Sequence, residues 1–378
     1  MTSADFSFSI EEYRSRLANI RKHMENKNVD VLVLDEVEAM TWLSGYGVSE
    51  TLWRCCCVPK NGEPFLLVRE LDVAPARERS WFPDIFGFVD WEEPVDVLAR
   101  EISRRGLTGG RLAFDSHSMT LARFAKLREA LSDTAFVDFG KTTWEVRLVK
   151  SPAEVDYLQQ AAEIADKAMA RAVKAVQLGG TERDVSAAAA AAYLKYGADD
   201  GYVGPITSGT GWDFLHGHLH SHALEQGAIV HIELIPRVRW HTARLMRSGV
   251  VGEPTEDQKR VAATLVELQD RQIAAMLPGA TARDVDAILR KAVVAHGLRK
   301  SFNNITGYTL GLWPPSSQRS SDFTRTFNPT AEWLVQPNMV FHMCVSAHGL
   351  AFSETVVVTD NGPQRLTKTP RVLYSTVE

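Results

Sequence analysis

The sequence contains few cysteines, and three of the four are consecutive. Cys55, Cys56 and Cys57 form the run, while Cys344 lies far away in the chain. Neighbouring residues of a strand point to opposite faces, so the run does not favour a framework of disulfides. The Cys-x-x-Cys spacing of structural zinc sites is absent as well. We therefore predict that the three cysteines are small residues in the core of a strand.

Basic segments and long apolar runs are also missing. The net charge is −5 and the pI is about 6.2, and no basic block alternates with aromatic residues, so we expect no nucleic-acid partner. No apolar run approaches the ~20 residues that cross a bilayer, and the start, MTSADFSFSIEEYRSRL, has no apolar core behind a basic flank. These absences favour a cytoplasmic protein that does not bind membranes. With 378 residues, the chain is long enough for two domains.

The C-terminal half of the sequence repeats itself. Residues 179–185 read GGTERDV and residues 279–285 read GATARDV, and a helical pattern follows each copy. Further along, His216–Gly252 and Pro337–Gly362 each contain two apolar runs in succession, which is typical of a hairpin of buried strands. We therefore expect two copies of a helix-plus-hairpin unit, packed face to face.

Polar residues interrupt the two hairpins at corresponding places. Superposing the copies pairs Glu233 with Cys344 and Arg244 with Glu354. We predict that these four side chains lie where the hairpins meet and form the floor of an active site.

The N-terminal part alternates helical and strand patterns, as in an α/β domain. Residues 42–47, reading WLSGYG, are predicted to form a turn, and Ser151-Pro152 is predicted to cap a long helix. The composition becomes rich in alanine after Ser151-Pro152, and this change marks a domain boundary. The other predicted elements are helix 10–26, strand 29–34, a hairpin of 52–58 with 64–68, helix 94–105, strand 111–115, helix 120–131 and strand 136–138.

Several separated motifs resemble the creatinase, aminopeptidase P and prolidase family. They read FSIEEYRSRL, VRLVKSPAEVDYL, LVQPNMVFHM and FSETVVVTDNG, and they occur in the family's order over nearly the whole chain. The resemblance implies an α/β N-terminal domain, residues 1–142, followed by an α+β pita-bread catalytic domain, residues 143–378. The catalytic domain would consist of the two pseudo-symmetric helix-plus-hairpin repeats.

Metallopeptidases of this family bind two metal ions through two aspartates, a histidine and two glutamates. The resemblance places these ligands at five positions, of which only Glu354 carries the expected residue. Arg244 would put a permanent positive charge beside a divalent ion, and Tyr308 and Cys344 are poor substitutes for the usual ligands. We therefore expect no metal and no cofactor, and a metal-dependent Xaa-Pro dipeptidase remains an alternative. The five positions are Glu233, Arg244, Tyr308, Cys344 and Glu354.

The block TGYTLGLWPPSS resembles the corresponding block of ectoine hydrolases, which belong to a metal-free branch of the family. Creatinase is a second metal-free hydrolase, and His216 falls at its catalytic histidine. Its two guanidinium-binding glutamates would fall on Met246 and Glu354, so one is absent, and residues 316–318 replace the acidic tail of ectoine hydrolases. The resemblance implies a metal-independent hydrolase of a C–N bond in a small zwitterionic amidine or amide, like ectoine hydrolase, with a creatinase-like amidinohydrolase as the alternative.

Hydrolysis of a C–N bond needs a base for water, an acid for the leaving nitrogen and a group that stabilises charge. We predict that His216 is the acid and base, with His218 as its rival because a shift of two residues keeps the same face of a strand. The histidines from 216 to 222 also fit a solvated edge strand. Glu354, with Glu233 behind it, would lie against a cationic substrate, and an ion pair of Glu354 with Arg244 is an equal alternative.

The remaining predicted contacts bind a small zwitterionic substrate. Tyr308 would donate a hydrogen bond, beside Arg244 and Cys344 on the floor. In related dimers a loop of the N-terminal domain reaches the partner's active site, so the resemblance implies a homodimer in which Arg54 clamps the substrate carboxylate and Trp53 covers it. Trp313 would line the same pocket. A lyase, a decarboxylase or a non-catalytic pita-bread binding module is also open, although the two-domain layout favours an enzyme.

Overall fold

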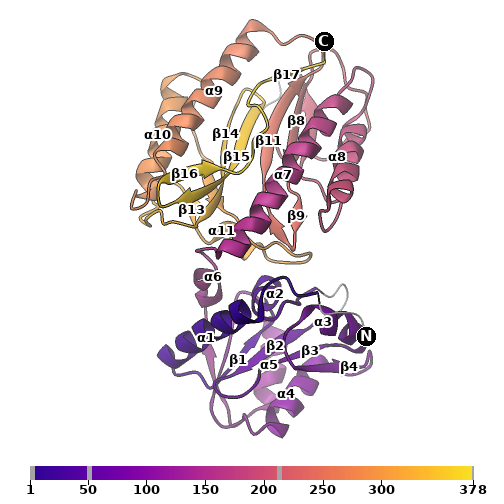
Figure 1. Ribbon diagram of the computed structural model, residues 1–378, viewed down its shortest axis with the longest axis vertical. Helices are drawn as coiled ribbons and strands as arrows, with labels where there is room; N and C mark the ends of the chain where they lie inside the picture. Colours follow the sequence, from indigo (N-terminus) through magenta and orange to yellow (C-terminus); the bar gives the residue numbers. More distant parts are fainter. Residues whose placement is uncertain (1–4, 49–52, 211–214, 377–378) are drawn as a thin grey trace. The chain divides into compact units, whose positions relative to one another are not determined.

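The structure is a computed structural model that describes residues 5–48, 53–210 and 215–376, and it divides into two compact units (Figure 1). The first unit contains Met1–Arg147 and Leu312–Ser321, and the second contains Leu148–Gly311 and Asp322–Glu378. The division by contacts follows Arg147, and the domain bounds 1–142 and 143–378 stay a prediction. That a segment of the second half, 312–321, belongs to the first unit was not predicted from the sequence.

A six-stranded mixed sheet in the order β4-β3-β2-β1-β5-β6 forms the centre of the first unit. β1 pairs with β2 in the antiparallel sense and with β5 in the parallel sense. The predicted helices, strands and hairpin in this unit are confirmed, with ends that differ by a few residues. The elements are α1 (Ile10–Asn26), β1 (Val31–Leu34), α2 (Val37–Ser44), β2 (Cys55–Pro59), β3 (Phe65–Arg69), η1 (Glu70–Asp72), α3 (Val73–Arg79), β4 (Asp84–Phe88), α4 (Pro94–Arg104), β5 (Arg111–Phe114), α5 (Leu121–Ala130), β6 (Ala135–Asp138) and α6 (Thr142–Val146).

The consecutive cysteines lie on β2, as predicted. Cys55, Cys56 and Cys57 are completely buried and free, and Cys55 and Cys57 pack with apolar residues of the sheet and of α4. Burial raises the pKa of all three thiols. They therefore act as small core residues.

The prediction of a turn at residues 42–47 is wrong for its first half, because Val37–Ser44 forms helix α2. The carboxylate of Glu36 caps this helix by accepting hydrogen bonds from the backbone N–H groups of Glu38 and Ala39, and Gly45 ends it with a φ of 87°. Every residue of α2 is buried. A helix buried on all sides has no polar stripe, so the sequence lacks the amphipathic pattern that would reveal it.

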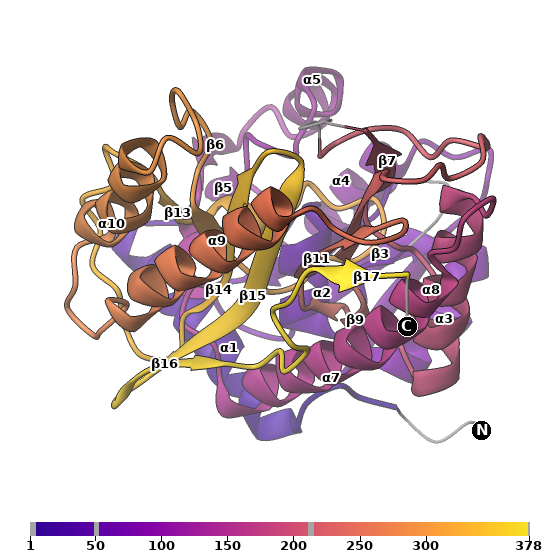
Figure 2. The same cartoon turned by 90° about the horizontal axis from the view of Figure 1, so that it is seen from above.

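Two larger sheets, a two-stranded sheet of β9 and β10, and the helices α7, α8, α9 and α10 form most of the second unit (Figures 1 and 2). One sheet has the order β17-β11-β8-β7, and the other has the order β13-β12-β14-β15-β16. The elements are α7 (Pro152–Ala175), α8 (Glu182–Tyr196), β7 (Ile206–Gly209), β8 (Ile229–Leu234), β9 (Arg237–Val238), β10 (His241–Thr242), β11 (Leu245–Val250), α9 (Glu256–Ala274), α10 (Ala282–Ala295), β12 (Gly307–Thr309), α11 (Ser320–Phe323), β13 (Thr326–Phe327), β14 (Val340–Ala347), β15 (Leu350–Thr359), β16 (Gly362–Arg365) and β17 (Tyr374–Ser375).

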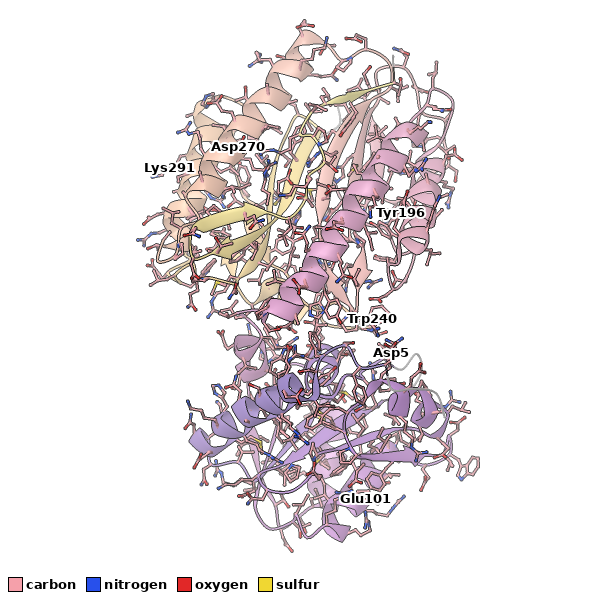
Figure 3. The ribbon with its side chains drawn as sticks, in the orientation of Figure 1. Asp5, Glu101, Tyr196, Trp240, Asp270 and Lys291 are labelled. Atoms are coloured by element: carbon pink, nitrogen blue, oxygen red, sulfur yellow. The ribbon has the colours of Figure 1, made fainter. Side chains whose placement is uncertain are left out.

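The helices cover one face of each sheet. Alanines of α7 and α8 pack on Val230, Ile232 and Leu234 of β8, and small side chains permit this close approach. On the other half, α9 and α10 pack on β14 and β15, while Lys291 of α10 is exposed at the outer edge of the unit (Figure 3). Polar residues that alternate with the apolar ones along β8 and β14 therefore point to the faces away from these helices.

The predicted repeat is present in the structure. α8, β8 and β11 correspond to α10, β14 and β15. Matching isolated bridges, Thr181 with Ala223 and Thr281 with Leu334, involve the residues just before α8 and α10. Thr181 forms a capping box with Asp184, whereas Thr281 makes no side-chain cap bond.

Side-chain hydroxyl groups connect the second strands of the two repeats. The Oγ of Ser353 accepts a hydrogen bond from the Met246 N–H at 2.7 Å, and the Oγ1 of Thr355 accepts one from the Arg244 N–H at 2.8 Å. These bonds bring β11 beside β15, so that the polar faces of the two hairpins meet there.

Candidate active site

Arg244 is the centre of a buried polar cluster between the two hairpins. Its guanidinium donates to Glu233 Oε1 at 3.2 Å and to Asp322 Oδ2 at 2.6 Å. The exposed fractions of the three side chains are only 4%, 4% and 0%. The predicted proximity of Glu233 and Arg244 is therefore correct. Asp322, on the short helix α11, is a third member of the cluster that the sequence did not predict.

Electrostatic contacts keep Arg244 charged despite its burial. Burial opposes the charge, but Tyr308, Asp322 and Glu233 together raise the pKa of Arg244 above the ordinary value of arginine. The guanidinium carbon lies 5.4 Å from the centre of the Tyr308 ring. Burial also raises the pKa of Tyr308, although Arg244 opposes this shift, so Tyr308 remains a neutral phenol and a hydrogen-bond donor.

Cys344 and Tyr308 lie on the polar side of the second sheet, as predicted for the floor. β14 pairs with β12 so that Tyr308 is opposite His342, and the two rings are 4.9 Å apart. Cys344 is two residues beyond His342 on the same face of β14. Burial, followed by the negative charge of Glu233, raises the pKa of Cys344 to about 12.

The raised pKa predicts that Cys344 reacts slowly with thiol reagents. In the folded protein at neutral pH, labelling by a disulfide reagent should be much slower than that of a small free thiol, because only the thiolate reacts. Denaturation should then make all four thiols react with the reagent together. The rate of colour formation measures this, and a Cys344→Ser variant is the control. A thiol that reacts rapidly in the native protein and disappears in this variant would contradict the prediction.

The predicted position of Glu354 is wrong. β14 and β15 pair so that Cys344 is opposite Ser353, whereas Glu354 is opposite Met343 and points to the other face of the sheet. There Glu354 is completely buried, and its carboxylate accepts hydrogen bonds from Arg247 Nη2 at 2.7 Å and from the Thr367 hydroxyl. Glu354 therefore does not join Glu233 on the floor.

The alternative prediction, an ion pair between Glu354 and Arg244, is also wrong. The partner of Glu354 is Arg247, which lies opposite Ile232 on the face of the sheet that packs against α7 and α8. Arg244 is three residues away, so its side chain points to the opposite face. The position beside Cys344 on the floor belongs to Ser353.

His216 borders a pocket of about 930 Å³ in the second unit. Ile229 of β8 and Ser346 of β14 contribute to the same pocket, but Glu233 and Arg244 are not among its described lining residues. His216 and His218 are both exposed, and the described part of this segment, 215–222, contains no strand. The interpretation as an edge strand is therefore wrong for the described residues.

A second histidine connects this pocket with the Arg244 cluster. Ile229, His231 and Glu233 alternate along β8 and share one face, with about 7 Å between successive members. His231 is 2% exposed, and neither of its ring nitrogens has a hydrogen-bond partner. Burial, and then the charge of nearby His216, lowers the pKa of His231 to about 3, so its imidazole is neutral at physiological pH. His231 was not predicted as a site residue. The signal that could have identified it is a histidine two residues before Glu233, on the same face of an apolar strand.

Trp53, Arg54 and Trp313 belong to the first unit. Trp53 Nε1 donates to Asp35 at 2.9 Å, and Arg54 Nε donates to the Gly47 carbonyl at 2.8 Å. Burial lowers the pKa of Arg54 from the ordinary value of arginine. The guanidinium of Arg319 lies 4.5 Å from the Trp313 ring. A role for the three residues in substrate binding stays a prediction.

Two family models match the chain. The Creatinase/Prolidase N-terminal domain matches residues 16–149, and metallopeptidase family M24 matches residues 156–360, which is more than half of the chain. The chain belongs to metallopeptidase family M24. The predicted resemblance to creatinase, aminopeptidase P and prolidase is thereby confirmed, and so is the α/β domain followed by a pita-bread domain.

Relatives within family M24 cover nearly the whole chain. The Xaa-Pro dipeptidase of Pyrococcus horikoshii is 30% identical over 363 residues, which are 95% of this chain and 98% of that protein. The ectoine hydrolase of Halomonas elongata is 24% identical over 404 residues, or 99% and 100% of the two chains. The prolidase structure from Thermococcus sibiricus is 22% identical, with a TM-score of 0.84 over 97% of this chain and 100% of that one, and this likeness shows the fold.

The residues of this M24 chain do not fit the two-metal centre that the family implies. Arg244, held in its charged form between two carboxylates, would lie beside the ions and repel them. Ser353 rather than Glu354 faces Cys344, so the floor has one carboxylate fewer than the sequence suggested. Glu233 is the one carboxylate left among the five positions, because Glu354 points away.

Proposed function

We propose that this protein is a metal-independent hydrolase that opens a C–N bond in a small zwitterionic amidine or amide, with ectoine-like cyclic amidines as the first candidates. The observation that supports this proposal is the Arg244 guanidinium, fixed by Glu233 and Asp322 in the middle of the floor. In this proposal the positive charge of Arg244 compensates the carboxylates of the floor, as metal ions do in the peptidases of the family.

The charge of the cluster favours a cationic substrate. Of the three side chains, Glu233 and Asp322 are acidic and Arg244 is basic, so a cationic group of a substrate would find two carboxylates beside one guanidinium. Tyr308, Cys344 and His231 remain neutral because of their shifted pKa values. Excess charge in a poorly solvated site is costly, and an amidinium or guanidinium group compensates it. An uncharged peptide group does not.

The proposed reaction needs one proton acceptor that later becomes a donor. His216 takes a proton from water as the water oxygen bonds to the amidine carbon, and it then gives that proton to the leaving nitrogen as the C–N bond breaks. The products are an amide or carboxylate and an amine, and no other reactant is consumed. Glu233 holds the positive charge of the substrate while the carbon becomes tetrahedral.

His231 contributes as a neutral imidazole. With a pKa of about 3, it neither captures the proton that His216 carries nor adds a positive charge to the floor. The single N–H of its neutral ring, whose nitrogens have no hydrogen-bond partner, can donate to the oxygen that develops charge, as in other enzymes with neutral histidines. Tyr308 is a second donor to the intermediate. Arg54 and Trp53 remain the proposed clamp and cover for the substrate carboxylate in a homodimer.

The experiment that tests this proposal is a turnover screen with and without chelator. Purified protein, treated with a strong chelator or left untreated, is incubated with ectoine, creatine and Xaa-Pro dipeptides, and the products are measured by NMR. We expect hydrolysis of a zwitterionic amidine or guanidino acid at the same rate in both samples.

The Pyrococcus horikoshii relative, named as an Xaa-Pro dipeptidase, provides the second candidate function. Cleavage of Xaa-Pro dipeptides that the chelator abolishes and that Mn²⁺ or Co²⁺ restores would overturn the proposal in favour of this function. Tight binding of a zwitterion without turnover of any compound would instead indicate a binding module.

A further inference from the structure

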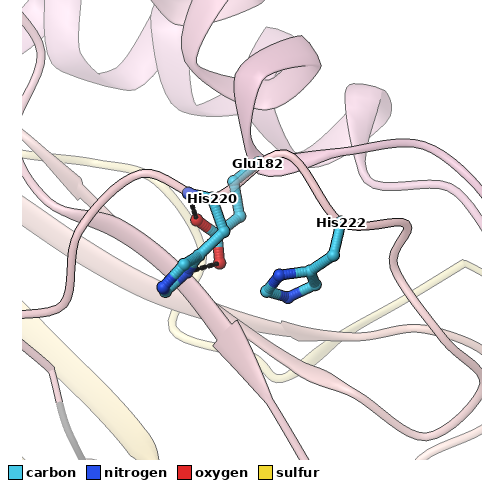
Figure 4. A group of neighbouring side chains, drawn as sticks. All are labelled: Glu182, His220 and His222. Carbon is cyan, nitrogen blue, oxygen red and sulfur yellow. Dashed lines mark hydrogen bonds and ion pairs between the residues drawn. The ribbon is translucent and has the colours of Figure 1, made fainter.

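A second cluster of polar side chains lies at the start of α8. Glu182 is the first residue of this helix and is completely buried, and His220 and His222 come from the segment that follows β7 (Figure 4). One potential ligand atom from each of the three residues lies within 4.8 Å of the other two. Within the described part of the chain, these three residues form a group of potential metal ligands.

Hydrogen bonds fix the carboxylate of Glu182 before any ion is bound. Its Oε1 accepts a bond from the Ser208 hydroxyl at 2.8 Å, and its Oε2 accepts one from the His220 N–H at 2.6 Å. The His220 Nδ1 atom is 3.3 Å from Oε1 (Figure 4). Partners of this kind orient a ligand and tune its basicity in known metal sites. The buried carboxylate is therefore held with its oxygens toward the histidine rings.

The two imidazole rings lie side by side. Their centres are 4.9 Å apart and their planes are inclined by 35° (Figure 4). Two histidines separated by one residue reach the same point, because alternate residues of an extended chain point to the same side. Zinc bonds of about 2.0–2.1 Å place tetrahedral ligand atoms about 3.4 Å apart, so a rotation of the exposed His222 ring completes the geometry.

We propose that Glu182, His220 and His222 form a mononuclear site for Zn²⁺ or a similar late transition-metal ion, with water as the fourth ligand. Two imidazoles and one carboxylate are a known zinc ligand set. Arg183, whose Nε donates to the Ser221 hydroxyl at 2.7 Å, and the N-terminus of α8 bring positive charge close to the cluster. The carboxylates of Glu182 and Asp184 in the first turn of α8 compensate it.

This site is separate from the Arg244 cluster. Ser208, which anchors Glu182, pairs with Val230, and Val230 packs against α7 and α8 on the helix-covered face of the sheet. His231 and Glu233 point to the opposite face. The ion therefore does not take part in the proposed hydrolysis. It links residues 220–222 to the start of α8.

The test is a titration of full-length protein, stripped with EDTA and dialysed, with Zn²⁺ in a calorimeter and with Co²⁺ in a spectrophotometer. We expect one ion for each chain and the strong visible absorption of four-coordinate Co²⁺. His220→Ala and His222→Ala should each weaken Zn²⁺ binding by more than about 100-fold, and Ser208→Ala by about 10–100-fold, because it removes only an orienting partner.

His218→Ala is the matched control, since it removes a histidine from the same segment that is not part of the cluster. Its Zn²⁺ affinity should equal that of the unmodified protein. His222 is exposed, so its variant should fold even if Glu182→Ala does not. Failure to bind Zn²⁺, or binding that His220→Ala and His222→Ala leave unchanged, would overturn the proposal. Metal-independent turnover would be unaffected by that result.

Discussion

Replacing Glu354 with alanine is expected to lower the free energy of unfolding by about 3–5 kcal/mol, because the change leaves a buried arginine without its counter-charge. Arg247 has no exposed surface, and it also donates to the carbonyls of Met246, Ser353, Thr369 and Pro370. Two further guanidinium groups, of Arg365 and Arg371, lie 3.8 Å from the Glu354 carboxylate. Glu354 is thus the anion that holds the C-terminal segment against the hairpins. Urea denaturation, followed by circular dichroism, measures the effect.

Glu253→Ala is the control for this measurement. Glu253 is exposed and its carboxylate pairs with Lys259 at 2.8 Å, so its loss should leave the free energy of unfolding almost unchanged. A double variant, Glu354→Leu with Arg247→Met, should recover much of the lost stability, because it removes both charges together. If Glu354→Ala unfolds at the same urea concentration as the unmodified protein, the buried ion pair does not contribute as described.

Replacing His216 with alanine is expected to reduce kcat by about 10²–10⁴-fold on the substrate found in the turnover screen. The loss should appear in kcat far more than in KM, because His216 moves protons and the charged cluster of Glu233 and Asp322 binds the cation. Steady-state kinetics and the pH dependence of kcat measure this change. The variant should also lose the limb of the pH profile that reports the acid and base group.

His296→Ala provides the comparison, since His296 is an exposed residue at the end of α10. Its kcat and KM should match those of the unmodified protein. His218→Ala separates the two candidate histidines: a large loss of kcat in that variant, with normal turnover by His216→Ala, would make His218 the acid and base. If both variants keep full turnover, the mechanism proposed here is wrong.

The fold was largely predictable because several signals agreed. Caps such as Ser151 and Thr181, apolar periodicity and the repeated GxTxRDV segment all indicated the same helices and hairpins. The error at Glu354 has a simple origin: side chains alternate along a strand, so a shift of one residue in the superposition moves a side chain from one face to the other. Register comes from backbone pairing with a distant strand, which local sequence does not encode.

Two members of the floor were not predictable for different reasons. Asp322 reaches Arg244 from a four-residue helix that follows the irregular segment 312–319, and no period or motif gives its direction. The sequence shows His231 within an apolar strand, but a single histidine in such a strand is more often a core residue than a functional one. Only its unpartnered nitrogens and its position beside Glu233 distinguish it.

The hydroxyl contacts between β11 and β15 bear on the symmetry of the second unit. β11 and β15 are equivalent strands of the two copies. The contact between them therefore pairs the same element of each copy, as in a two-fold dimer. The same strand of each copy therefore supplies the edge through which the two copies associate. One hairpin carries an acid at position 233, while the other carries a thiol and a hydroxyl, at Cys344 and Ser353.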